Sequence, residues 1–169
     1  MKKTKILLIP LILQVLLFSA YAKDTDLSAI QLQLLKTIKV TVIAPLYLPK
    51  GYSLEKVEAV SENAKGPGQG NHYNLTYSNL AKRFSIETIS GGVGDIPYQE
   101  VKKVQTKFGT TYIYYNDSCL QTSWLEYNKN FYKLISGEKC GYKYKLDMHE
   151  NPITVLEAEK ILKSLTLVK

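Results

Sequence analysis

The sequence has few of the residues from which metal sites and nucleophilic sites are most often built. It contains only two histidines and two cysteines among 169 residues. His72 and His149 stand far apart in sequence and belong to no cysteine pattern, whereas a zinc site needs three or four ligands at usable spacing. The G-x-S-x-G elbow of many serine hydrolases is also missing. We therefore predict no metal site, no cofactor and no catalytic residue.

Long hydrophobic runs are missing too, since a membrane-spanning helix needs about 20 apolar residues. The run from Ile6 to Phe18 is shorter. It follows the basic segment Met1 to Lys5 and precedes Ala20-Tyr21-Ala22, a small-x-small cleavage site. This arrangement predicts a signal peptide at residues 1–22, cleaved after Ala22, and a periplasmic or secreted mature protein. An uncleaved signal that anchors the chain is the alternative.

The sequence also lacks clusters of charged residues. The chain has a formal net charge of +7, and loss of residues 1–22 removes three lysines and no acid, which leaves +4. The remaining lysines are scattered. Nucleic-acid binding proteins concentrate basic residues on one surface, so we expect no nucleic-acid partner. The mature residues 23–169 are enough for a single domain with one core.

The two cysteines, Cys119 and Cys140, both fall in the part predicted to be exported. An even cysteine count in an oxidising compartment indicates a disulfide. A redox pair and a pair of metal ligands are the alternatives, but the C-x-x-C spacing typical of redox pairs is absent. We predict a structural bridge that staples the end of a β-hairpin.

Periodicity predicts a helix at each end of the mature chain. Asp24 to Ile38 is expected to form a short helix capped by Asp26, with Leu27, Ile30, Leu34 and Ile38 on its apolar face. Near the C-terminus, Thr154-Val155-Leu156-Glu157 is a capping box. Its apolar stripe is predicted to contain Val155, Ala158, Ile161, Leu162 and Leu165.

Between the helices the chain is predicted to be mostly strand. Pro45 and Pro49 prevent a helix from crossing residues 44–52, and Gly51 can take a positive φ there. Leu46, Tyr47 and Leu48 are apolar enough to predict a partly buried corner. Alternation and turn residues predict strands at 53–62, 73–77, 83–89, 101–107, 110–115, 118–127, 131–136 and 141–146. The expected fold is a single α+β domain. We expect an antiparallel sheet of about six to eight strands, with the C-terminal helix packed on one face and a short N-terminal helix.

Three motifs occur in order along this chain. They are Tyr47-Leu48-Pro49-x-Gly51-Tyr52, then Trp124 to Asn128 leading through a turn to Phe131-Tyr132-Lys133-Leu134, and Thr154-x-x-Glu157-Ala158-x-x-Ile161-Leu162-x-Ser164-Leu165. Together they resemble a bacterial domain of unknown function with a YLP-x-GY start and an E-x-x-x-I-x-x-S-L closing helix. The resemblance implies an extracytoplasmic module and carries over no catalytic residue.

Tyrosine is abundant, and 12 of the 13 tyrosines lie beyond the predicted signal peptide. Alternation places Tyr112 and Tyr114 on one face of a strand, and Tyr142 and Tyr144 fall in another predicted strand. Tyrosine packs well in sheets and also serves as a rigid, amphipathic contact residue. Both interpretations stay open, and these four tyrosines are the candidate binding residues.

The sequence therefore favours an exported, non-catalytic binding or accessory protein of the cell envelope, whose ligand is an envelope protein or a glycan. One alternative is a secreted hydrolase that uses two carboxylates. The acids considered for it are Glu87, Asp95, Glu100 and Glu126. A second alternative is an inhibitor or antagonist that binds its target through the tyrosine-bearing face.

Overall fold

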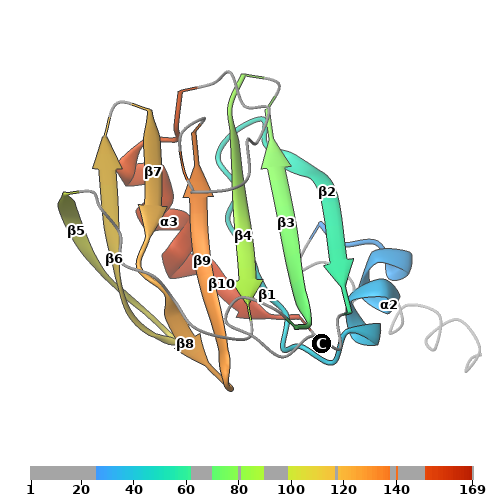
Figure 1. Cartoon of the computed structure of the whole chain (residues 1–169). Helices are drawn as coiled ribbons and strands as arrows, with labels where there is room; N and C mark the ends of the chain where they lie inside the picture. The colour runs from blue at the N-terminus through green and yellow to red at the C-terminus, as the bar shows by residue number, and fades with distance from the viewer. Residues whose placement is uncertain are drawn as a thin grey trace, which may run out of the picture.

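A large antiparallel sheet dominates the computed structural model, which describes residues 26–61, 70–79, 81–89, 99–116, 118–137, 140 and 151–168. The eight strands follow the order β2-β3-β4-β9-β7-β6-β5, with β8 paired to β9 (Figure 1). All of their pairings are antiparallel. The strands are β2 (Ser53–Val60), β3 (His72–Ser78), β4 (Arg83–Ile89), β5 (Glu100–Thr106), β6 (Gly109–Asn116), β7 (Cys119–Thr122), β8 (Leu125–Tyr127) and β9 (Asn130–Ser136).

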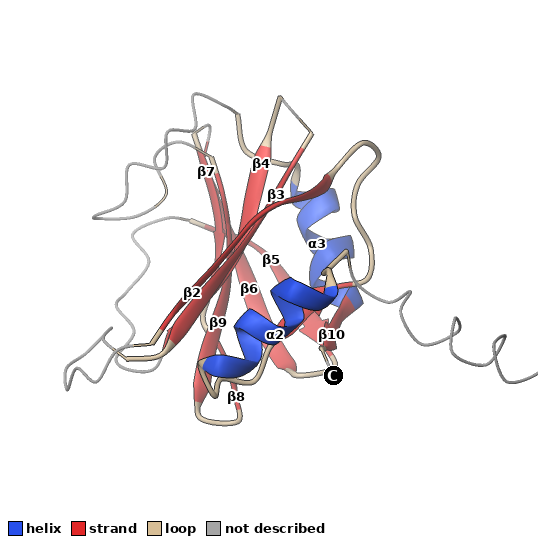
Figure 2. Cartoon of the chain, turned by 90° about the vertical axis from the view of Figure 1, so that its right-hand side faces the viewer, coloured by secondary structure: helices blue, strands red, loops and turns tan. Residues whose placement is uncertain are grey.

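The remaining elements form a second layer on one side of this sheet. Helix α3 (Val155–Ser164) lies across the sheet, and a two-stranded ribbon of β1 (Ile43–Pro45) and β10 (Leu165–Leu167) lies beside it (Figure 2). Helix α2 (Ala29–Thr37) lies near β2. The structure therefore confirms the predicted α+β class, the strand number and the packing of the C-terminal helix.

The core lies between the two layers because successive side chains of a strand alternate between its faces. Tyr73, Leu75 and Tyr77 of β3 are buried toward the second layer. Across the ladder, Tyr77 pairs with Phe84 and their rings stack at 4.9 Å between centroids. The predicted two-residue alternation of this hairpin is thus confirmed.

Two buried tyrosine hydroxyls join the large sheet to the second layer. The Tyr73 hydroxyl accepts a hydrogen bond from the Ile43 N–H at 2.8 Å and donates one to the Ile43 carbonyl at 3.0 Å. The Tyr132 hydroxyl donates to the Thr41 carbonyl at 2.7 Å. Burial raises the pKa of Tyr73 far above its ordinary value, so this hydroxyl keeps its proton and acts as both donor and acceptor.

Helix α3 begins where the capping box predicts. The Thr154 hydroxyl accepts a hydrogen bond from the Glu157 N–H, and the Glu157 carboxylate accepts one from the Thr154 N–H. The residues buried in the helix are Ala158, Ile161 and Leu162. The helix ends at Ser164, and the chain continues directly into β10, which the sequence analysis did not predict.

The N-terminal helix differs from its prediction in start and in orientation. It is capped by Ser28, not Asp26, through a capping box with Gln31. Leu35 and Ile38 are buried at 1% exposure each, whereas Ile30 is 81% exposed and Leu34 is 42% exposed. The prediction of Ile30 and Leu34 as core residues is therefore wrong, because the helix turns its Leu35 side toward the core.

The proline corner is also more exposed than predicted. Leu46 and Tyr47 are exposed, and only Leu48 is partly buried among the three apolar residues between the prolines. A backbone hydrogen bond from the Leu46 N–H to the Ser164 carbonyl fixes the corner to the end of α3. Ala44, at the start of the corner, is fully buried.

The predicted strand 118–127 is two strands, β7 and β8. The break falls at Ser123-Trp124, where the Ser123 N–H donates to the Tyr112 carbonyl at 2.8 Å. Asn128 and Lys129 then turn the chain with φ of 54° and 64°, the paired positive values of a tight hairpin turn. The predicted strand 141–146 lies outside the described residues.

The predicted disulfide between Cys119 and Cys140 is present, with 5.1 Å between the Cα atoms. Cys119 begins β7, and Cys140 follows the end of β9, the partner of β7. The bridge packs against Ile135. It closes a loop with a sequence separation of 21, which is worth about 3 kcal/mol in the chain-entropy account.

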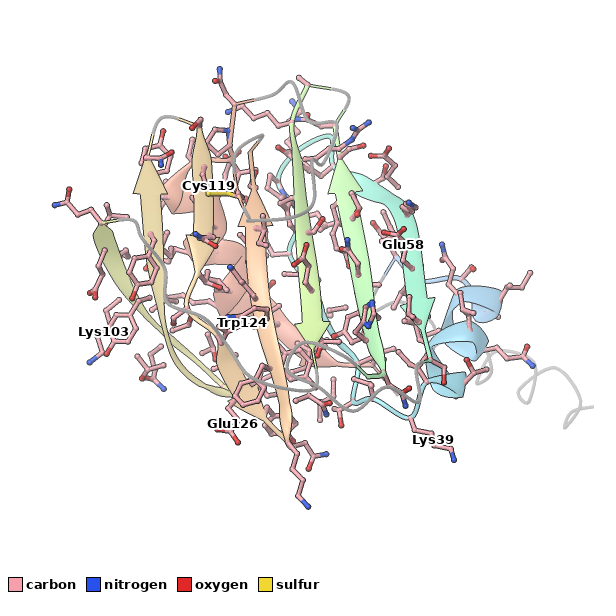
Figure 3. All side chains as sticks on the ribbon, viewed as in Figure 1. Lys39, Glu58, Lys103, Cys119, Trp124 and Glu126 are labelled. Atoms are coloured by element: carbon pink, nitrogen blue, oxygen red, sulfur yellow. A yellow bond between two sulfur atoms is a disulfide. The ribbon has the colours of Figure 1, made fainter. Side chains whose placement is uncertain are left out.

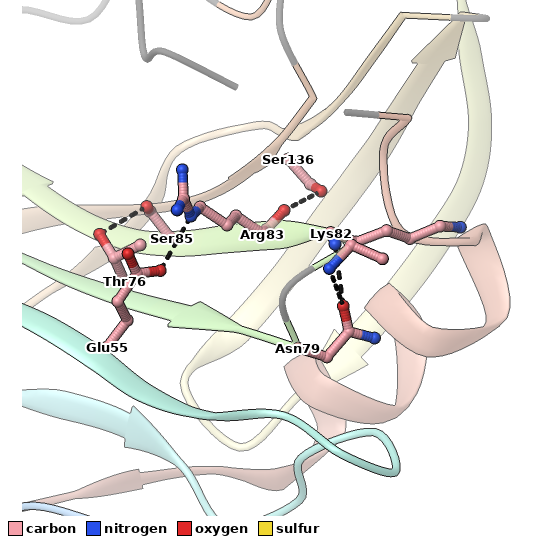
Figure 4. A network of polar contacts seen from close by, with 8 residues as sticks. Glu55, Thr76, Asn79, Lys82, Arg83, Ser85 and Ser136 are labelled. Carbon is pink, nitrogen blue, oxygen red and sulfur yellow. Dashed lines mark hydrogen bonds and ion pairs between the residues drawn. The ribbon is translucent and has the colours of Figure 1, made fainter. Parts of the chain in front are cut away.

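Polar contacts secure the hairpin between β3 and β4 (Figure 4). The Asn79 side-chain oxygen accepts hydrogen bonds from the N–H groups of Ala81 and Lys82 at 3.1 and 2.8 Å. The Arg83 Nε lies 2.8 Å from the Glu55 carboxylate, which ties β4 to the start of β2. The Ser136 hydroxyl donates to the Arg83 carbonyl and so links β9 to β4.

We predict that Tyr73→Phe lowers the free energy of unfolding by about 1–3 kcal/mol, because the Ile43 N–H and carbonyl lose their buried partner. Chemical denaturation measures the loss. Tyr112→Phe is the matched control, since the structure assigns no hydrogen bond of this kind to a half-exposed ring on the other face. Equal stability of the Tyr73→Phe variant and the parent would contradict the anchoring role.

We also predict unequal costs at two glycines with positive φ, Gly51 at 84° and Gly137 at 103°. A Cβ at Gly51 would meet only Asn79 Cβ, at 3.9 Å, whereas one at Gly137 would overlap the Ser118 carbonyl. Gly51→Ala should cost about 1–2 kcal/mol from backbone strain alone. Gly137→Ala should cost at least about 3 kcal/mol because the backbone must also move. Thermal unfolding that ranks the two variants in the opposite order would disprove this.

Candidate functional site

The candidate site lies on the face of the large sheet opposite α3, which we call the helix-free face. Tyr112 and Tyr114 of β6 are on it, because the intervening Ile113 is buried in the core. Both tyrosines are half-buried, and Tyr114 pairs in register with Gln121 of β7. The structure thus places two of the four predicted tyrosines on one accessible face. Tyr142 and Tyr144 lie outside the described residues.

Trp124, the single tryptophan of the chain, is on the same face (Figure 3). It sits in the break between β7 and β8 and is half-buried. The Lys133 Nζ lies 5.1 Å from the centre of its ring, a cation–π contact. Lys133 belongs to the helix-free face because its neighbours Tyr132 and Leu134 are buried in the core.

A row of polar side chains crosses four strands beside this contact. The pairing register aligns Glu58 of β2 with Asn74 of β3, Asn74 with Glu87 of β4, and Glu87 with Lys133 of β9. Directly opposed side chains in neighbouring strands lie close enough to interact. The row therefore runs from the Trp124–Lys133 contact on the central strand β9 to the edge strand β2.

Burial pushes the charged pair in this row toward its neutral forms. It raises the pKa of the Glu87 carboxyl, with Lys133 opposing the shift and Glu58 adding to it. It lowers the pKa of the Lys133 amine, with Glu87 opposing that shift. In addition, the Asn74 Oδ1 is buried without a hydrogen-bond partner. This part of the face therefore holds polar groups whose hydrogen-bonding capacity is not fully used.

Exposure varies across the helix-free face. Ser85, Gln121, Ile135 and Cys119 are buried there. Accessible residues occur at both edges of this face, such as Glu58 of β2 and Lys103 of β5, and around Trp124 between them. We call five of them, Tyr112, Tyr114, Glu87, Trp124 and Lys133, the helix-free site.

The described acids among those considered for hydrolysis lie on three different strands. Glu87 is in the helix-free site, whereas Glu100 is exposed at the start of β5 and Glu126 is exposed on β8. Asp95 lies outside the described residues. The carboxylate that interacts with Glu87 is Glu58, which was not among the acids considered. Its place between the apolar Val57 and Ala59 in an alternating segment is the sequence signal that could have indicated it.

A small cavity lies on the opposite side of the sheet. A cavity of about 10 Å³ between the sheet and α3 is lined by Ile86, Leu134, Leu162 and their neighbours. That volume holds at most one water molecule. In the part of the chain that the structure describes, no three His, Cys, Asp or Glu side chains form a metal-binding group.

A comparison of the chain with protein families, with curated proteins and with solved structures found no match. Within the described ranges, neither helix has the length and hydropathy that a membrane crossing requires.

We predict that the burial of Glu87 makes stability depend on pH. A carboxyl whose pKa is raised by folding favours the folded state while it is protonated, and this contribution fades as pH rises from the ordinary value of 4.5 through the raised pKa. Glu87→Gln removes the effect, so the variant should gain stability relative to the parent between acidic and neutral pH.

Denaturant unfolding at a series of pH values measures this difference. Glu126→Gln, which removes one exposed carboxylate of β8, controls for the loss of a negative charge. A stability difference between the parent and Glu87→Gln that stays constant with pH would show that Glu87 is not buried as described.

Proposed function

We propose that this protein is an exported, non-catalytic binding protein of the cell envelope and that its helix-free site holds a neutral saccharide. The observation that carries the proposal is that the half-buried rings of Tyr112, Tyr114 and Trp124 all lie on the face opposite α3. Rigid aromatic side chains supply contact area at low entropic cost.

The chemistry of the site suits a sugar ring. A pyranose presents flat C–H faces that stack on aromatic rings, and hydroxyl groups at its edge that need hydrogen-bond partners. Next to Trp124, Lys133 and Glu87 supply a donor and an acceptor. The buried Asn74 Oδ1 has unused accepting capacity in the same row.

The balance of charge favours a neutral ligand. Lys103 lies over the Tyr112 ring, with Nζ 5.8 Å from its centre, and Lys133 faces Glu87. Two other cations of this face are already paired, Lys56 with Glu58 at 2.6 Å and Arg83 with Glu55 at 2.8 Å. A surface with both signs interspersed has no strong field for a polyanion.

The distribution of apolar residues favours a saccharide over a protein partner. Protein interfaces centre on desolvated apolar anchors, yet most of the exposed large apolar side chains of the described residues lie in α2, the proline corner and α3, namely Ile30, Leu34, Leu46, Tyr47 and Leu156. The others are Val101 of β5 and Leu167 of β10. The helix-free site instead combines aromatic rings with polar groups.

The export part of the proposal is supported by the signal-like residues 1–22 and by the Cys119–Cys140 disulfide, since such bridges persist in oxidising compartments. Membership of the extracytoplasmic family that the three motifs resemble is proposed on the same grounds. Cell fractionation tests the proposed export directly.

We predict that neutral oligosaccharides change the fluorescence of Trp124, which is the only tryptophan and therefore reports on the site. The titration uses chitooligosaccharides and cellooligosaccharides as probes and a sulfated polysaccharide as the charged comparison. Tyr112→Ala combined with Tyr114→Ala should weaken binding roughly tenfold or more through lost stacking and contact area.

The matched control is Tyr47→Ala, which removes an exposed tyrosine ring far from the helix-free face. The proposal fails if no neutral probe changes the fluorescence, if only the charged polymer binds, or if the control weakens binding as much as the double variant. Capture of an envelope protein that depends on Tyr112 and Tyr114 would favour the antagonist alternative.

A second candidate function is hydrolysis of the bound saccharide. It is favoured by the electrostatic interaction of Glu87 with Glu58 across Asn74, since burial raises the pKa of the Glu87 carboxyl while Glu58 is exposed, a difference that separates acid and base roles in glycosidases. Chromatography of the incubated oligosaccharides decides between the two functions. Cleavage that Glu87→Gln abolishes would replace the binding function with the enzymatic one.

A further inference from the structure

The outward face of α3 carries a stripe of exposed residues that the proposed function does not use. Leu156, Lys160 and Lys163 recur at steps of four and three residues and are all exposed. At 3.6 residues per turn they lie opposite the buried Ala158 and Ile161. The stripe therefore points away from the sheet and from the helix-free face.

The proline corner widens this stripe. The Tyr47 N–H donates to the Ser164 hydroxyl at 3.0 Å, which places the corner against the end of α3. The Lys160 Nζ lies 5.9 Å from the centre of the Tyr47 ring. Leu46 is 52% exposed and Leu156 is 60% exposed. Apolar side chains and a tyrosine thus stand beside a lysine whose charge is free to face outward.

The Glu159 carboxylate on this helix is paired with two lysines. It lies 2.8 Å from the Lys163 Nζ and 3.3 Å from the Lys102 Nζ. The hydrogen bond from Lys163 and then that from Lys102 hold the pKa of the Glu159 carboxyl below its usual value. Lys102, Lys160 and Lys163 outnumber Glu157 and Glu159, which leaves this side of the molecule with a positive surplus.

From this arrangement we infer that the α3 stripe, defined as Leu46, Tyr47, Leu156, Lys160 and Lys163, docks onto the surface of a membrane that contains anionic phospholipid. Lysines near an anionic bilayer are attracted to its headgroups. Exposed leucine and tyrosine side chains enter the interfacial region, where tyrosine prefers to lie. The occupant is thus a lipid surface with negative charge, and not a protein.

Docking in this way has a geometric consequence. Helix α3 and the helix-free site lie on opposite sides of the sheet (Figures 2 and 3). A molecule held at the bilayer by α3 would keep Tyr112, Tyr114 and Trp124 facing away from the lipid. Membrane docking and saccharide binding would therefore occur together without competition.

The test is flotation of the chain that lacks residues 1–22 with vesicles of phosphatidylcholine, made with and without phosphatidylglycerol. This form keeps every described element, since the first of them begins at Ala29. The parent should float with the anionic vesicles, less so at high salt because exposed charges are screened. Leu156→Ser combined with Lys160→Glu should lower the partition coefficient at least about tenfold.

The matched control is Ile30→Ser combined with Lys36→Glu on α2. It makes the same chemical changes at exposed positions of the other helix. The inference is overturned if the parent does not float, if it floats equally with neutral vesicles, or if the control loses as much binding as the stripe variant. Circular dichroism checks folding, and Lys160→Gln against Lys36→Gln replaces the pair if either double variant misfolds.

Discussion

The hydrogen bonds between the Tyr73 hydroxyl and the backbone of Ile43 are the constraint on which the rest of the arrangement depends. They connect β3 of the large sheet to β1, and β1 holds β10 and through it the end of α3. The buried N–H and carbonyl of Ile43 have this hydroxyl as partner, and leaving such groups unpaired is costly. The second layer is therefore fixed to one face of the sheet, and neither of the two described helices lies on the opposite face.

The tyrosines follow this division. Tyr73, Tyr77 and Tyr132 are buried in the core, where their rings fill volume and two of their hydroxyls hold the second layer. Tyr112 and Tyr114 are on the other face and half-buried. The packing interpretation of tyrosine holds for the buried set, and the binding interpretation stays a proposal for Tyr112 and Tyr114. Alternation around a buried neighbour is what separates the sets.

Short sequence motifs predicted the structural features that depend on residues close together in the chain. The capping box of Thr154 and Glu157 and the turn at Asn128 were visible in sequence because their partners are close in the chain. The exposure of Ile30, the break at Trp124 and the strand β10 depend on packing against distant segments. For the same reason the sequence indicated Tyr112 and Tyr114 but not the Trp124–Lys133 contact or the Glu58–Glu87 interaction, which require the register of four strands.

The register also explains why the helix-free site and the α3 stripe are separate. The row from Glu58 to Lys133 spans strands that β1 and α3 cover only from behind, so α3 contributes no residue to the helix-free site. Conversely, Lys160 and Leu156 project from a helix whose other side is buried, so changing them leaves the sheet intact. The two surfaces lie on opposite sides of one core, and this separation is why the two proposals, saccharide binding and membrane docking, can be tested independently of each other.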